Sequence, residues 1–126
     1  MNRKQLSHYP EIQPFITKDG STIRELMHPG SHGVSNQSLA EARIPPAAKT
    51  ILHQHHKTEE IYYIIAGTGL MTLASARFNV TAGDSICIPP GTAHAIENTG
   101  DEVLVLLCCC APAYTHDDTE LLENSG

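Results

Sequence analysis

The feature that most constrains the fold of this chain is its division into short runs rich in Ile, Val, Thr and Tyr, separated by Gly- and Pro-containing breaks. Such runs are typical of strands, and the breaks are typical of turns. Helical periodicity is nearly absent. The sequence therefore predicts an all-β protein, and strands at this spacing favour a closed barrel or a sandwich. We expect strands over residues 23–28, 37–44, 50–53, 61–66, 69–74, 77–80, 85–88, 94–98 and 103–110.

The charge and the apolar pattern disfavour several classes of partner. The 126 residues carry a formal net charge of −6, whereas nucleic acids and anionic membranes favour basic surfaces. No apolar run approaches the roughly 20 residues of a membrane span. The charged residues 1–5 are followed by no apolar run, so we expect no signal peptide. These features predict a protein that binds neither nucleic acid nor membrane.

The cysteines point to a reducing compartment. Three of the four are consecutive, Cys108 to Cys110, and the fourth is Cys87. Neighbouring cysteines in a strand point to opposite faces and do not pair readily with each other, so we expect no disulfide framework. A cytoplasmic location fits this pattern. We interpret the run as small apolar strand residues, with soft-metal binding as the alternative.

Two clusters of histidine and carboxylate, about forty residues apart, are the candidate site. The first contains His53, His55 and Glu60, and the second contains His94. Residues two apart in a strand share a face, so His53 and His55 would project together if the strand extends that far. Three imidazoles and one carboxylate form a donor set for one divalent transition metal, which could be Fe, Mn, Ni, Cu or Zn. Up to two positions on a six-coordinate ion would stay open for water, substrate or dioxygen.

The spacing of both clusters resembles the two motifs of the cupin superfamily. Residues 53–67 match the first motif, HxH, three or four residues, E, six residues, G. Residues 83–98 match the second motif, G, five residues, PxG, two residues, H, three residues, N. The sequence departs from the pattern upstream, where Ala47 stands in place of the glycine that commonly precedes the first histidine.

This resemblance implies a small single-domain cupin (a cupin type-2 conserved barrel) with a jelly-roll or double-stranded β-helix architecture. Residues 1–126 would form one domain, in which residues 36–110 are the conserved barrel. Residues 1–30 would supply an N-terminal arm and strand, which small cupins frequently exchange in homodimers. Residues 111–126 would be an acidic tail, in which residues 117–122 form one helical turn or lie along the barrel.

Two further residues are candidates for contact with a substrate. Tyr62 shares a strand face with Glu60, where it would pack or contact substrate; alternatively it is a catalytic phenol, because a nearby divalent cation eases its deprotonation. Arg43 shares a strand face with Glu41. An inward Arg43 would bind a substrate carboxylate, whereas an outward Arg43 would be solvated. The sequence leaves both questions open.

The motifs do not select a reaction, because cupins include dioxygenases, decarboxylases, isomerases, lyases and binding proteins. The first hypothesis is a metalloenzyme of the dioxygenase, isomerase or lyase type that acts on a small oxygenated metabolite. The alternative is a non-catalytic module that binds or senses a small molecule or sugar and carries a structural metal. No G-x-S-x-G motif for a serine nucleophile is present.

Overall fold

The computed structural model describes residues 3–123 and confirms the all-β prediction. Two short 3-10 turns, η1 (Arg3–Gln5) and η2 (Tyr9–Glu11), precede the strands. No helix in this part of the chain is long and apolar enough to cross a membrane. The strands are β1 (Phe15–Ile16), β2 (Thr22–Met27), β3 (Ser38–Ile44), β4 (His53–His55), β5 (Glu59–Ala66), β6 (Thr68–Leu73), β7 (Ala76–Thr81), β8 (Ser85–Ile88), β9 (His94–Asn98), β10 (Leu104–Ala111) and β11 (Thr119–Leu121).

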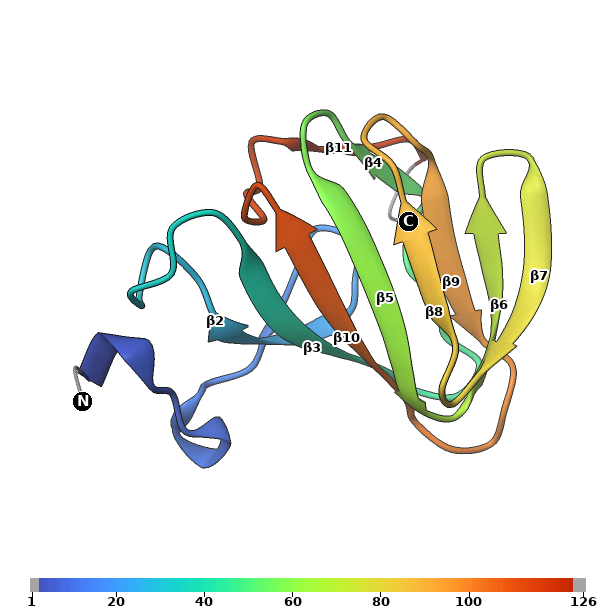
Figure 1. Ribbon diagram of the computed structural model, residues 1–126. Coiled ribbons are helices and arrows are strands. Elements are labelled where there is room, and N and C mark those ends of the chain that lie inside the picture. Colours follow the sequence, from blue (N-terminus) through green and yellow to red (C-terminus); the bar gives the residue numbers. More distant parts are fainter. Residues whose placement is uncertain (1–2, 124–126) are drawn as a thin grey trace.

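The strands form two antiparallel sheets in a jelly-roll arrangement (Figure 1). Sheet A has the order β1-β2-β3-β10-β5-β8, and sheet B has the order β11-β4-β9-β6-β7. Most neighbours in a sheet are distant in the sequence, as with β3 beside β10 and β4 beside β9. This connectivity brings both motif segments to the space between the sheets.

Period-two alternation directs one face of each sheet into the core. In β5, Tyr62 and Ile64 are buried, while Ile61, Tyr63 and Ile65 are exposed. The same alternation holds in β8 and β9. Removing this apolar surface from water is the main driving force for packing the two sheets together. The most deeply buried apolar side chains are Ile64, Met71, Ile88, Ile96, Leu104 and Leu106.

One strand starts later than expected from the sequence, and the C-terminal segment takes the second of its two expected arrangements. The strand expected over residues 50–53 is instead β4, His53–His55, because the Thr50 hydroxyl accepts a hydrogen bond from the Ile96 backbone before the strand begins. Residues 117–122 contain no helical turn. Their strand β11 lies along β4, which would otherwise present an unpaired edge.

Ala47 adopts the backbone shape that the missing motif glycine would supply. Its φ is +67°, in the left-handed region that residues with a Cβ rarely adopt. The Asn98 backbone N–H donates to the carbonyl of the next residue, Ala48, at 2.9 Å. The turn before the first motif is therefore retained despite the substitution.

Gly67 and Gly83, one in each motif, differ in why glycine is required at the position. Both have positive φ, +93° and +95°. A Cβ at Gly67 would lie 3.0 Å from the Leu104 Cα, whereas a Cβ at Gly83 would meet nothing within 4 Å. We predict that both Gly→Ala variants lose about 1 kcal/mol to backbone strain. Gly67→Ala should lose a further 1–3 kcal/mol, roughly, through overpacking. Urea unfolding of both variants measures the difference, and equal losses would contradict the packing argument.

Candidate metal centre

Three buried histidines converge on the inner face of sheet B. His53 and His55 lie two residues apart on β4, and His94 on β9 is the register partner of His53. One ring nitrogen from each lies within 4.8 Å of the other two. Because β4 and β9 pair side by side, residues about forty positions apart in the sequence meet at one point.

The backbone fixes the orientation of two of these imidazoles. His53 Nδ1 lies 2.7 Å from the Ile51 carbonyl oxygen, and His94 Nδ1 lies 2.9 Å from the Thr92 carbonyl oxygen. A carbonyl oxygen only accepts hydrogen bonds, so each Nδ1 carries the hydrogen. In the neutral ring, Nε2 then holds a lone pair, which is the form that binds a metal.

Thr119 of β11 plays the same part for His55. His55 Nδ1 lies 2.9 Å from the Thr119 hydroxyl oxygen. That hydroxyl donates its own hydrogen to the Thr115 carbonyl at 2.9 Å, so it accepts from the imidazole. Thus all three rings present Nε2 to the same space. Orientation of metal-binding histidines through their second nitrogen is a common feature of metal sites.

Glu60 approaches this space from the opposite sheet. Its Oε1 lies 3.2 Å from His55 Nε2 and 3.4 Å from His94 Nε2. Burial alone would raise the pKa of Glu60, but the neighbouring His55 and His94 outweigh it and lower that pKa to about 2. A buried carboxylate therefore faces the converging nitrogens, and Cys110 Sγ lies 3.4 Å from its other oxygen.

The donor set fits a metal cation. Glu60 Oε1 and His94 Nε2 are buried without any hydrogen-bond partner, which is costly unless another group satisfies them. Burial lowers the pKa of His53, so its ring is held in the neutral form that a metal requires. Ligands about 2.1 Å from one ion lie roughly 3–4 Å apart, and the Glu60 separations fall in this range. The three-histidine cluster could therefore hold a metal, with Glu60 beside it.

Tyr62 and Arg43, the other two candidates, lie in different environments. Tyr62 is buried and lines the cavity beside the histidines, with its ring centroid 6.0 Å from that of His94. Burial raises the pKa of its phenol well above the usual range. Arg43 does not line this cavity: its side chain is 43% exposed and its Nε lies 3.2 Å from Glu41 Oε1. The face of β3 that points into the cavity carries Ala42 instead.

The cysteine run alternates as strand geometry requires. Cys108 and Cys110 are buried and line the cavity, whereas Cys109 is exposed on the outer face. Burial raises the pKa of the Cys108 and Cys110 thiols, which favours the protonated form. All four cysteines of the chain are free thiols.

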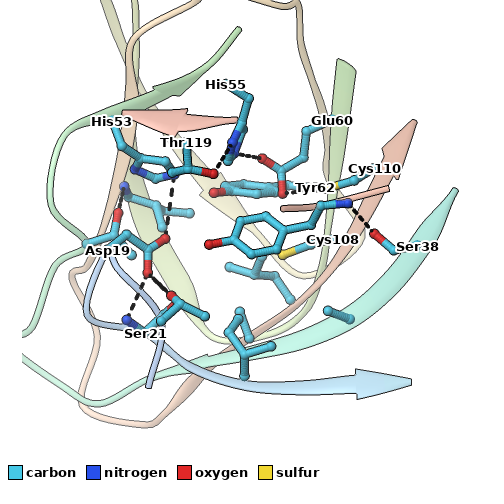
Figure 2. A pocket seen from close by; sticks show the side chains of 18 of the residues that line it. Asp19, Ser21, Ser38, His53, His55, Glu60, Tyr62, Cys108, Cys110 and Thr119 are labelled. Atoms are coloured by element: carbon cyan, nitrogen blue, oxygen red, sulfur yellow. Dashed lines mark hydrogen bonds and ion pairs between the residues drawn. The ribbon is translucent and has the colours of Figure 1, made fainter. Parts of the chain in front are cut away.

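Sequence reasoning missed several polar residues at the site, among them Asp19 and Thr119. It also missed Tyr114, which lines the cavity with its ring centroid 5.7 Å from that of His55. Asp19 Oδ2 lies 3.6 Å from His53 Nε2. Figure 2 shows the Asp19 carboxylate directed at His53. In the sequence Asp19 marks only a turn before Gly20, and Thr119 is one of several polar residues in an acidic tail. No spacing links either residue to the motifs, because pairing in three dimensions alone brings β11 and the β1–β2 turn to the histidines.

Comparisons with known proteins agree with this geometry. The family model described as "Cupin domain" matches residues 40–110, which include all four candidate metal ligands. This chain belongs to the cupin family. An uncharacterized protein of Methanocaldococcus jannaschii is 56% identical to this cupin over 117 residues, covering 93% of this chain and 94% of the relative.

Two further relatives have names that refer to oxalate. An oxalate-binding protein of Thermotoga maritima is 37% identical over 69 residues, covering 55% of this chain and 57% of that protein. The structure of oxalate decarboxylase from Bacillus subtilis superposes with a TM-score of 0.76 at 28% identity. That match covers 90% of this cupin but only 30% of the decarboxylase chain.

The hydrogen bond from His55 to Thr119 gives a test of the site. We predict that Thr119→Val, which removes the acceptor, weakens metal binding by roughly 10- to 100-fold. Thr119→Ser keeps the hydroxyl and should retain most of the affinity. Competition with a chromophoric chelator measures both dissociation constants. Equal affinity of the Val and Ser variants would show that the hydroxyl does not orient His55.

Proposed function

We propose that this cupin binds one divalent transition metal through His53, His55, Glu60 and His94. The observation that carries the proposal is the convergence of three oriented imidazoles and a buried carboxylate, two of whose atoms have no hydrogen-bond partner. These donors accept Fe, Mn, Ni, Cu or Zn.

We further propose that the protein is an enzyme of the dioxygenase, isomerase or lyase type, acting on a small oxygenated metabolite. A bound metal would supply a Lewis acid for a carbonyl or enolate oxygen, or would activate dioxygen if it is redox-active. Tyr62 lines the cavity with a protonated phenol, so we assign it the role of donating a hydrogen bond to a substrate oxygen. We assign Arg43 no role, because it pairs with Glu41 outside the cavity.

The second candidate function is a non-catalytic module that binds or senses a small molecule. One relative is named for oxalate binding rather than for a reaction, and this chain aligns with 57% of it. For such a module, the metal would stabilise the packing of the strands or hold the ligand in place. Tyr62 would then only pack in the core and contact the ligand.

We predict that the isolated protein carries close to one transition metal ion per chain by elemental analysis. The double variant His53→Ala/His94→Ala should lose it, because half of the proposed donors are removed. His56→Ala is the matched control, since His56 has a 53% exposed side chain paired with Glu120. Unchanged metal content in the double variant would rule out this site.

A metabolite screen of the metal-loaded protein separates the two functions. Oxygen uptake, or loss of a 1,2-diketone, enol or uronate, supports the enzyme. Saturable thermal stabilisation without consumption of any compound supports the binding module instead. The double histidine variant should abolish either response.

The outer face of sheet A is the proposed surface for a homodimer. Ile61, Tyr63 and Ile65 of β5 are 44–46% exposed there, and Leu107 and Cys109 of β10 lie beside them in register. A patch of this kind on one sheet face is typical of association, and a two-fold axis lets it pair with itself. The free thiols fit a cytoplasmic setting.

We predict a dimer at micromolar concentration by analytical ultracentrifugation. Tyr63→Glu should convert it to a monomer, because the charge would be buried at the interface. Phe78→Glu is the control, since Phe78 is similarly exposed (36%) but lies on β7 of sheet B. A monomeric wild-type protein would contradict the proposal.

A further inference from the structure

We infer that the cavity selects a small oxygen chelate with an apolar body and at most one negative charge, and that Asp19 disfavours dianions such as oxalate. This inference rests on the metal site proposed above and concerns which ligand that site takes. It separates this cupin from the relatives whose names refer to oxalate.

The cavity has one polar end and an apolar body. Its volume is about 50 Å³, whereas one water needs roughly 10–15 Å³ on the same measure. His53, His55, Glu60 and Asp19 form the polar end (Figure 2). A ligand that binds there through oxygen atoms would place the rest of its structure against apolar side chains. These are Ala40, Ala42, Ile44, Ile96, Leu106 and Cys108.

The charge of the lining is negative. Among the described residues that line the cavity, Asp19, Glu25 and Glu60 are acidic, and none is Lys or Arg. With neutral histidines, Asp19 and Glu60 already balance the two charges of a divalent cation, and Glu25 adds a third negative charge to the lining. A dianion would therefore add two negative charges to a partly enclosed space that offers no compensating cation beyond the metal.

The Asp19 carboxylate is held in place and cannot swing away from an incoming anion. Its Oδ1 accepts hydrogen bonds from the Thr17 hydroxyl (2.7 Å), the Ser21 hydroxyl (2.6 Å) and the Ser21 backbone N–H (2.9 Å). Its own backbone carbonyl accepts from the Ile51 N–H at 2.8 Å. Oδ2 is left directed at His53 Nε2, 3.6 Å away. Asp19 thus places a fixed negative charge beside the proposed metal, on a segment outside both family motifs.

The test uses oxalate, pyruvate and 2-oxobutanoate. Each of them chelates a metal through two oxygen atoms carried on adjacent carbons. The full-length protein is loaded with Co²⁺, and dissociation constants are measured from the visible Co²⁺ spectrum and by calorimetry. Comparing pyruvate with 2-oxobutanoate isolates one methylene group at constant charge. Comparing wild type with Asp19→Asn for each ligand cancels the intrinsic affinity of that ligand for Co²⁺.

We expect 2-oxobutanoate to bind about fourfold more tightly than pyruvate, the effect of burying one methylene. In Asp19→Asn we expect oxalate affinity to rise about tenfold. Affinity for 2-oxobutanoate should rise only about threefold, because a monoanion feels half of the repulsion. Glu59→Gln removes an equal charge from an exposed position next to Glu60 and should leave the affinity for both ligands unchanged. Oxalate affinity that stays constant or falls in Asp19→Asn would overturn the inference, as would equal binding of pyruvate and 2-oxobutanoate.

Metal content distinguishes failure of this inference from failure of the proposed function. Wild type should bind Co²⁺, and Asp19→Asn should bind it more weakly because one negative charge beside the ion is removed. Ligand titrations of both proteins therefore use Co²⁺ well above its dissociation constant. If Co²⁺ binds and is lost in His53→Ala/His94→Ala while the ligand preferences are absent, only the ligand inference fails. If wild type binds no Co²⁺, or Co²⁺ binds without any of the three ligands binding, the inference is overturned as well.

Discussion

The site depends on three imidazoles whose Nδ1 hydrogens are all committed to protein acceptors. Two acceptors are carbonyls that come two residues before the histidine, and the third is the Thr119 hydroxyl on a neighbouring strand. With the hydrogens fixed on that side, every Nε2 lone pair faces the same buried space as the Glu60 carboxylate. A cation bound there would satisfy the unpartnered Glu60 Oε1 and His94 Nε2 together.

The two sheets supply different parts of this centre. Sheet B supplies the histidines, and sheet A supplies Glu60, Tyr62 and most of the apolar wall of the cavity. The carboxylate and the imidazoles therefore face each other across the core. Segments outside the conserved motifs complete the site, since β11 supports His55 and the β1–β2 turn carries Asp19 to His53.

The family relationship and the cavity answer different questions. Membership of the cupin family accounts for the barrel and for the positions of the candidate ligands. The oxalate-related relatives align with only part of their length and say little about the wall of this cavity. That wall combines apolar side chains with hydroxyl groups and three acidic residues, which is a local property of this chain.

The sequence was enough to predict the all-β class, the approximate strands and the two spaced clusters of candidate ligands, because period-two alternation and motif spacing are local properties of the chain. It left open the face of β3 on which Arg43 lies. In the structure Ala40, Ala42 and Ile44 face the cavity, so Arg43 lies on the opposite face of the strand. Nor did the sequence indicate Asp19 or Thr119 at the site. Tertiary structure alone decided these points, because pairing between β4 and β11 and the packing of the β1–β2 turn join residues that no sequence spacing relates.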